Sequence, residues 1–132
     1  MEYCIEKLTI AIEFDGTIVE DQYPGIGSEK PLASAIIKAL QAKGHQIILY
    51  THRRGKELQA AVDWCAGRDL FFHHLNHNPF QKYSSRKTEA DVYIDGKNLG
   101  GMPAWEEIFQ VLHPYELSEI NYRNKTNSDI SS

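Results

Sequence analysis

The chain has 132 residues, of which 42% are hydrophobic, with a formal net charge of -4 at pH 7 and a pI near 5.8. This length suits one domain with its own core and is too short for two. The acidic balance argues against nucleic acid as a partner, because nucleic-acid-binding proteins usually carry a broad basic face. No apolar run approaches the ~20 residues of a membrane span, and Cys4 and Cys65 form no metal or redox motif. We therefore expect a cytoplasmic protein.

The first predicted element is a buried strand that delivers two acidic side chains into a glycine turn. The apolar run over 8–12 leads to Glu13, Phe14, Asp15 and Gly16. Burying two carboxyl groups at the end of a core strand costs free energy unless they hold a cation or move protons. The pattern therefore predicts a functional site at the end of this strand.

Further helices and strands alternate along the chain. The stretch 20–27 is rich in acids, Gly and Pro and predicts a loop. Ser28 as N-cap and Gly44 as terminator bound a predicted helix, whose apolar residues recur at spacings of three and four. The other predicted elements are a strand over 46–50, a helix over 56–66, a strand starting at 70–72, a strand over 90–95 and a helix over 105–113.

The segment 73–87 is polar and irregular and predicts a long loop. Its histidines suggest a zinc site, but no cysteine lies nearby and no helix aligns His73 with His77, so we expect the loop to overhang a substrate site instead. Residues 121–132 lose periodicity and predict a mobile tail after a single domain over 1–120.

This order of elements predicts an α/β fold, with an open, mainly parallel sheet and helices on both faces. Ligands of such sheets bind beyond the carboxyl ends of the strands. Seven basic residues belong to segments near that edge and would attract an anionic small molecule: Arg53, Arg54, Lys56, Lys82, Arg86, Lys87 and Lys97. The polar residues that follow the strands there are Glu13, Asp15, Thr51, His52, Arg53 and Asp95.

These residue types suit a cation and a phosphate. Glu13 and Asp95, with a backbone carbonyl and water, match the ligands of Mg²⁺; the alternative is that each acid only caps the turn after it. The turn 14–17 can aim backbone N–H groups at one anion, with Gly16 permitting close approach. Thr51 and Lys87 can add a hydroxyl and an ammonium; the alternatives are a turn residue and a solvated side chain.

The order and identity of these residues resemble the haloacid dehalogenase (HAD) superfamily of phosphotransferases. Its four motifs are Asp-x-Asp, a Ser or Thr ending the next strand, a Lys or Arg, and an acidic pair after a strand. The matching residues are Glu13 with Asp15, Thr51, Lys87, and Asp95 with Gly96. Segments 13–19 and 86–98 are most similar to short bacterial members with no sizeable cap domain, and the likeness covers about residues 8–112.

The resemblance implies a HAD-like Rossmannoid fold and a Mg²⁺-dependent phosphatase. Glu13 would attack phosphorus to give an acyl phosphate, and Asp15 would act as acid and then base. Mg²⁺, held by Glu13, Asp95 and the Asp15 carbonyl, would offset the phosphate charge together with Lys87. The residues expected to contact substrate are Phe14, Gly16, Thr17, His52, Arg53 and Asn98.

Two residues depart from the family pattern. Glu13 is one methylene longer than Asp, which moves the attacking oxygen by roughly an ångström and can lower the rate about a hundredfold. Gly96 replaces the second acid of the last motif, and losses of metal-supporting groups commonly cost ~10 to 100-fold.

We therefore expect a phosphohydrolase-like protein with reduced activity on a small phosphomonoester. One alternative is a degenerate phosphate-binding or regulatory module that retains the fold. Another is an assembly protein that uses an exposed helix face with Trp105 and Phe109. The sequence does not indicate the oligomeric state or the substrate.

Overall fold

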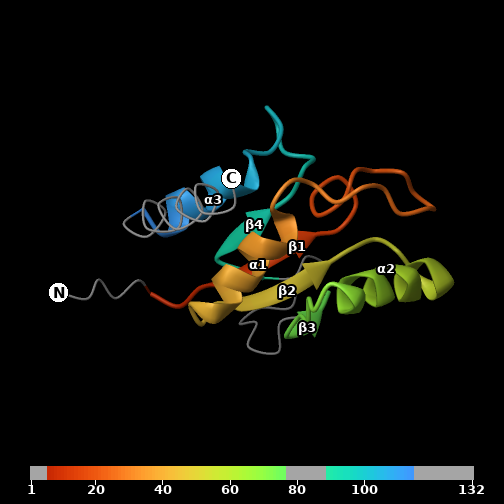
Figure 1. Ribbon diagram of the computed structural model, residues 1–132, viewed down its shortest axis with the longest axis horizontal. Coiled ribbons are helices and arrows are strands. Elements are labelled where there is room, and N and C mark those ends of the chain that lie inside the picture. The colour runs from red at the N-terminus through yellow and green to blue at the C-terminus, as the bar shows by residue number, and fades with distance from the viewer. Residues whose placement is uncertain (1–5, 77–88, 115–132) are drawn as a thin grey trace, which may run out of the picture.

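The computed structural model describes residues 6–76 and 89–114. Lys87 and the predicted tail over 121–132 lie outside these ranges. Within them, four strands and three helices follow one another along the chain (Figure 1): β1 Thr9–Glu13, α1 Ala33–Ala42, β2 Gln46–Tyr50, α2 Gly55–Gly67, β3 His74–Leu75, β4 Val92–Ile94 and α3 Trp105–Leu112.

The strands form one parallel sheet in the order β3-β2-β1-β4. This confirms the predicted α/β class and the open parallel sheet, and no sizeable cap domain occurs among the described residues. None of the helices in that part of the chain has the length and apolar character needed to cross a membrane.

β1 lies inside the sheet and is buried on both faces. Ile10 and Ile12 are fully buried on one face, and Ala11, whose side chain points to the opposite face, is 2% exposed. Burial on both sides explains why the strand is almost wholly apolar. Glu13 then follows at the carboxyl end of β1, in register with Tyr50 of β2.

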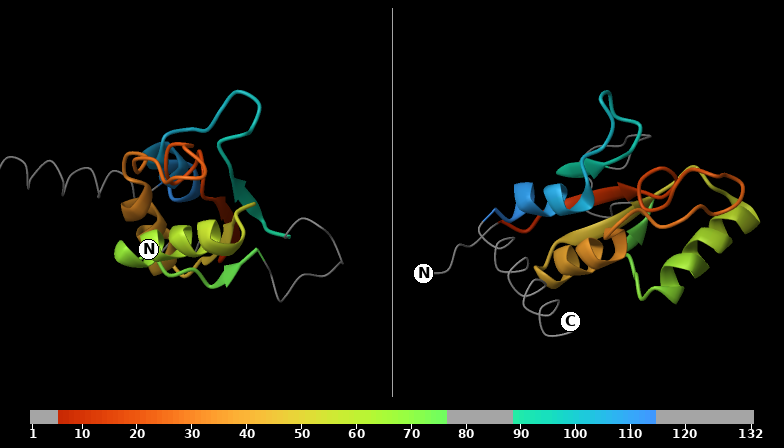
Figure 2. Two further views of the ribbon diagram at one scale, coloured as in Figure 1. Left: turned by 90° about the vertical axis from the view of Figure 1, so that its right-hand side faces the viewer. Right: turned by 45° about the horizontal axis from the view of Figure 1, so that its top comes forward.

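The three described helices pack on the face of the sheet that carries Ile10 and Ile12. One hydrophobic cluster joins these side chains to Ile37 of α1, Ala61 of α2 and Phe109 of α3, and Figure 2 shows all three helices on one side of the sheet. The sequence predicts helices on both faces, and the three helices in the described residues cover one of them. The reason lies in the crossovers β1-α1-β2 and β2-α2-β3, which advance in the same direction across the sheet. Because both crossovers are right-handed, α1 and α2 lie on the same side.

The predicted start of α1 at Ser28 is wrong. Leu32, immediately before the helix, has a left-handed φ of 66°, so the helix begins only at Ala33. No side chain caps the helix from Leu32; instead Glu29 Oε2 accepts the N–H of Ser34 at 3.1 Å. A carboxylate beside the first turn replaces the expected hydroxyl cap and also complements the helix dipole.

The third strand begins later than the apolar run 70–72 predicts. Leu70 is buried in the core, but Phe71 is 65% exposed, and pairing with β2 starts only near His73. The backbone N–H of His73 donates to Ile47 O at 2.9 Å, and His73 Nδ1 accepts the N–H of Ile47 at 3.0 Å. This histidine therefore helps to dock the edge strand β3.

α3 is attached to the turn that follows β1. Trp105 and Phe109 are 1% and 0% exposed, and Trp105 Nε1 donates to the carbonyl of Thr17 at 3.1 Å. These two aromatic residues belong to the core and provide no exposed helix face. The structure thus contradicts the assembly hypothesis in the form that rests on them.

The turn after β4 packs directly on the turn after β1. Gly96 N–H donates to Thr17 Oγ1 at 2.8 Å, and a Cβ on Gly96 would lie 2.1 Å from the carbonyl oxygen of Gly16. Only glycine fits at this contact without moving backbone. The close approach brings Asp95, immediately before Gly96, beside the end of β1.

We predict that Gly96→Ala destabilises the protein by about 1–3 kcal/mol, because the added methyl group forces the two turns apart. Gly67→Ala is the control, since nothing lies within 4 Å of a Cβ there and alanine favours helix by up to about 1 kcal/mol. Urea unfolding measures both variants. A Gly96→Ala variant with the natural unfolding midpoint would contradict the close contact.

Candidate functional site

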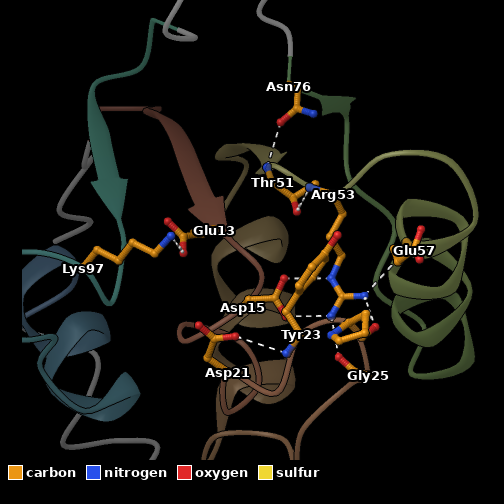
Figure 3. A network of polar contacts seen from close by, with 11 residues as sticks. Glu13, Asp15, Asp21, Tyr23, Gly25, Thr51, Arg53, Glu57, Asn76 and Lys97 are labelled. Carbon is orange, nitrogen blue, oxygen red and sulfur yellow. Dashed lines mark hydrogen bonds and ion pairs between the residues drawn. The ribbon is translucent and has the colours of Figure 1, made fainter.

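A cavity of about 400 Å³ opens beyond the carboxyl ends of β1 and β2 (Figure 3). Five of its lining residues are predicted by the strand-end pattern, and three come from the 20–27 loop and the turn after β4. The lining residues are Glu13, Asp15, Asp21, Tyr23, Thr51, His52, Arg53 and Lys97.

Glu13 lies at the wall of this cavity, 5% exposed, beside Asp95 and Lys97. Burial, followed by the hydrogen bond and negative charge of Asp95, raises the pKa of Glu13 to about 7. Lys97 acts in the opposite direction, with its Nζ 3.9 Å from Glu13 Oε1. Because the charge of Asp95 disfavours the ionisation of Glu13, added positive charge beside this pair is stabilising.

This donor set fits a magnesium ion held by few protein ligands. Glu13 at the end of β1 and Asp95 immediately after β4 offer carboxyl oxygens to one place. Mg²⁺ typically uses one or two carboxylates and keeps several waters. Within residues 6–76 and 89–114, no cluster of three or more His, Cys, Asp or Glu side chains is arranged to hold a metal. Water would therefore have to complete the coordination.

Asp15 faces a different partner, the buried guanidinium of Arg53. Arg53 Nε and Nη2 bond to the two Asp15 oxygens at 2.7 and 2.8 Å, and Arg53 is 2% exposed. Hydrogen bonding to Asp15 raises the pKa of Arg53. The other N–H groups of Arg53 donate to the carbonyl oxygens of Pro24 at 3.1 Å, Gly25 at 2.6 Å and Glu57 at 3.2 Å.

These bonds use the full set of five guanidinium N–H donors. Arg53 therefore has no donor left for a substrate, so the expectation that it binds substrate directly is wrong. It lines the cavity as a structural cation, and Asp15 is held by it in one orientation.

The 20–27 loop reaches the cavity because it is drawn onto Arg53. The guanidinium carbon lies 5.3 Å from the Phe14 ring centre and 5.1 Å from the Tyr23 ring centre. Tyr23 remains 59% exposed, and its N–H donates to Asp21 Oδ1 at 3.3 Å. Sequence reasoning misses Asp21 and Tyr23, since the loop composition does not reveal which side chains Arg53 will attract.

Thr51 is held so that its hydroxyl keeps a donor for a ligand. Its N–H donates to Asn76 Oδ1 at 2.8 Å, and its Oγ1 accepts the N–H of Arg53 at 3.1 Å. Because the hydroxyl already accepts, its proton is the part that can turn towards an anion in the cavity. Asn76, in the segment 73–87 that is expected to overhang a substrate site, supports Thr51 from a backbone φ of 54°.

Two N–H groups of the expected anion nest of the turn 14–17 are already used in internal bonds. Gly16 N–H donates to Val19 O at 2.8 Å, and Thr17 N–H donates to Phe14 O at 3.2 Å. Phe14 and Thr17 are fully buried, and neither they nor Gly16 belong to the described lining of the cavity. These three predicted substrate contacts are therefore parts of the turn that aims Glu13 and Asp15.

The remaining predicted residues divide between the cavity and the surface. His52 lines the cavity, with its Nε2 3.5 Å from the hydroxyl of Tyr50. Asn98 is exposed, and its carbonyl accepts the N–H of Gly101 at 2.9 Å. The structure therefore does not bring Asn98 to the cavity, and Lys87 falls outside the described residues.

We predict that Arg53→Lys destabilises the protein by about 3 kcal/mol, because an ammonium cannot reproduce the fork that satisfies Asp15 and three carbonyls. Arg68→Lys is the control, since Arg68 pairs with Glu29 at the surface and should lose less than about 1 kcal/mol. Urea unfolding compares the two. Similar losses in both variants would contradict the special role of Arg53.

The raised pKa of Glu13 makes stability depend on pH in the absence of metal. The pKa rises from 4.5 to about 7 on folding, so this stabilising contribution is complete below about pH 4.5 and is lost as pH rises through 7. The loss approaches roughly 3 kcal/mol. Glu13→Gln should remove this part of the pH dependence in urea unfolding with EDTA. Parallel profiles for the variant and the natural protein would contradict it.

Comparison with known proteins gives one clear relative. No family model matches the chain, and no curated protein matches it. Among solved structures, it is similar to a conserved protein from Bacteroides thetaiotaomicron, with 40% sequence identity, coverage of 96% of this chain and 99% of that chain, and a TM-score of 0.75. Identity at this level extends over nearly the whole of both chains. The chain therefore belongs to the family of this conserved Bacteroides protein.

Proposed function

We propose that the protein is a Mg²⁺-dependent phosphohydrolase of the HAD superfamily that acts on a small phosphomonoester. The observation that carries this proposal is the meeting of Glu13 and Asp95 at one wall of a cavity that also presents Thr51 and Lys97. The order of the motifs along the chain supports the same assignment. A bound Mg²⁺ would supply positive charge to the phosphate, and Glu13, Asp95 and the Asp15 carbonyl would hold it.

In this proposal the side chains divide the reaction between them. A Glu13 oxygen attacks phosphorus, forming an acyl phosphate as the alcohol leaves, and water then attacks that intermediate to release phosphate. Asp15 accepts a proton from this water through a lone pair that Arg53 does not use. The same lone pair carries the proton that Asp15 gives to the leaving alkoxide in the first step, so both bonds to Arg53 can stay closed.

The second candidate function is a phosphate-binding or regulatory module without turnover. Two observations favour it: both oxygens of Asp15 are already engaged by Arg53, and the backbone contact at Gly96 leaves no space for the second acid of the family motif. Either function would use a phosphorylated small molecule rather than nucleic acid.

We also propose a cytoplasmic location. Cys65 is consistent with it, because this residue is a buried free thiol, and burial raises the pKa of the thiol to about 12.

Phosphate release from a panel of phosphomonoesters with Mg²⁺ tests the proposal. We expect slow turnover by the natural protein and a loss of at least about a hundredfold in Glu13→Gln, because the amide cannot attack phosphorus. Glu13→Asp should be faster if the extra methylene misplaces the oxygen. Glu107→Gln, on the exposed face of α3, is the matched control and should leave the rate unchanged.

Three other results would count against a phosphohydrolase that uses Glu13 as its nucleophile. Turnover found only in Glu13→Asp would favour the binding module. Natural turnover that survives in Glu13→Gln would contradict nucleophilic attack by this residue. Failure of the natural chain to bind Mg²⁺ would count against both candidate functions.

A further inference from the structure

Lys97 brings an exposed positive charge to the cavity. Its Nζ is 3.9 Å from Glu13 Oε1, and its side chain is 64% exposed. The backbone is fixed, because Lys97 N–H donates to Asp95 Oδ1 at 2.8 Å. The backbone of Lys97 is therefore held beside Asp95, and Figure 3 shows its side chain extending towards Glu13. Four methylenes give the exposed ammonium several positions within reach.

The other cationic side chain in the described lining cannot serve in the same way. Arg53 gives all of its donors to Asp15 and to backbone carbonyls. His52 also lines the cavity, close to the Tyr50 hydroxyl. Among the described lining residues, Lys97 combines a full positive charge, unspent donors and access to the space beside Glu13.

A cation between Glu13 and Asp95 would change the partner of Lys97. Without the cation, the ammonium offsets the charge of Glu13 and lowers its pKa, against the larger effects of burial and Asp95. With a divalent cation on the same carboxyl oxygens, like charges only a few ångströms apart repel. The ammonium would then leave Glu13, and an anion bound next to the cation would attract it.

We propose that Lys97 is a phosphate-binding residue that exchanges between the Glu13 carboxylate and the bound phosphate. The inference rests on the proposed function and adds an anion ligand to it. Lys97 lies two residues after Asp95, so one short turn supplies both a carboxylate for the cation and an ammonium for the anion.

This exchange predicts changes of opposite sign for the two ligands. Lys97→Met should weaken the binding of inorganic phosphate about tenfold, because a charge-assisted hydrogen bond is lost. The same substitution should tighten the binding of Mg²⁺ alone about threefold, because a competing positive charge is removed. Lys97→Arg should keep both affinities near those of the natural protein.

Titration calorimetry tests the proposal with two probes, MgCl₂ alone and inorganic phosphate at saturating Mg²⁺. Lys38→Met, on the exposed side of α1, is the control that removes one charge away from the cavity. Urea unfolding checks that Lys97→Met keeps its stability, as expected for an exposed side chain.

The outcomes separate this inference from the function on which it rests. If the natural protein binds both probes and Lys97→Met binds phosphate as tightly as Lys38→Met does, the role of Lys97 is overturned while the proposed function stands. Weakening of both ligands together would also overturn the exchange. If the natural protein binds neither probe, both the proposed function and the role of Lys97 that rests on it are overturned.

Discussion

The buried guanidinium of Arg53 is the constraint on which the shape of the cavity depends. A desolvated cation is tolerated only when its charge is paired and its donors are satisfied. Arg53 meets this requirement by collecting Asp15 from the turn after β1, two carbonyls from the 20–27 loop and one from the first turn of α2. Segments far apart in the chain are thereby fixed around one planar group. The loop carrying Tyr23 lies over the cavity because the cation beneath it has to be covered and bonded.

The two acids at the carboxyl end of β1, Glu13 and Asp15, consequently have different environments. Both oxygens of Asp15 are bonded to the buried Arg53, whereas Glu13 lies beside Asp95 and the exposed ammonium of Lys97. The charges of Asp15 and Arg53 neutralise each other in a fixed pair. In the proposed function, Glu13 and Lys97 can instead change partners when a cation or an anion binds. This separation allows a carboxyl group to be buried at the end of a core strand without a fixed counter-charge. Burial there has a cost in stability, which the core around β1 offsets.

Much of this arrangement follows from local patterns, and the remainder depends on contacts that no local pattern records. β2 has its predicted bounds because an apolar run lies between Gly44 and a polar segment, and the strand-end rule places Glu13, Asp15 and Thr51 correctly. The burial of Arg53 could not be foreseen, since a basic residue after a strand is usually solvated and its acceptors here come from a distant loop. The amides of Gly16 and Thr17 similarly bond within their own turn, a competition that composition alone does not reveal. The helical apolar spacing of Trp105 predicts a helix that covers the sheet edge and offers only weak support for assembly, and the burial of Trp105 with its bond to Thr17 O agrees with the first.

The contact between Gly96 and the carbonyl of Gly16 restricts how this site can change during evolution. A single substitution that introduced an acid at position 96 would have to displace the backbone that aims Glu13 and Asp15. An acidic pair at positions 95 and 96 is therefore reachable only through coordinated changes in two turns. Position 97, whose side chain is 64% exposed, can accept other side chains without displacing this backbone. Descendants of this sequence can thus adjust the net charge around the carboxyl pair at position 97 while the geometry beneath it stays unaltered.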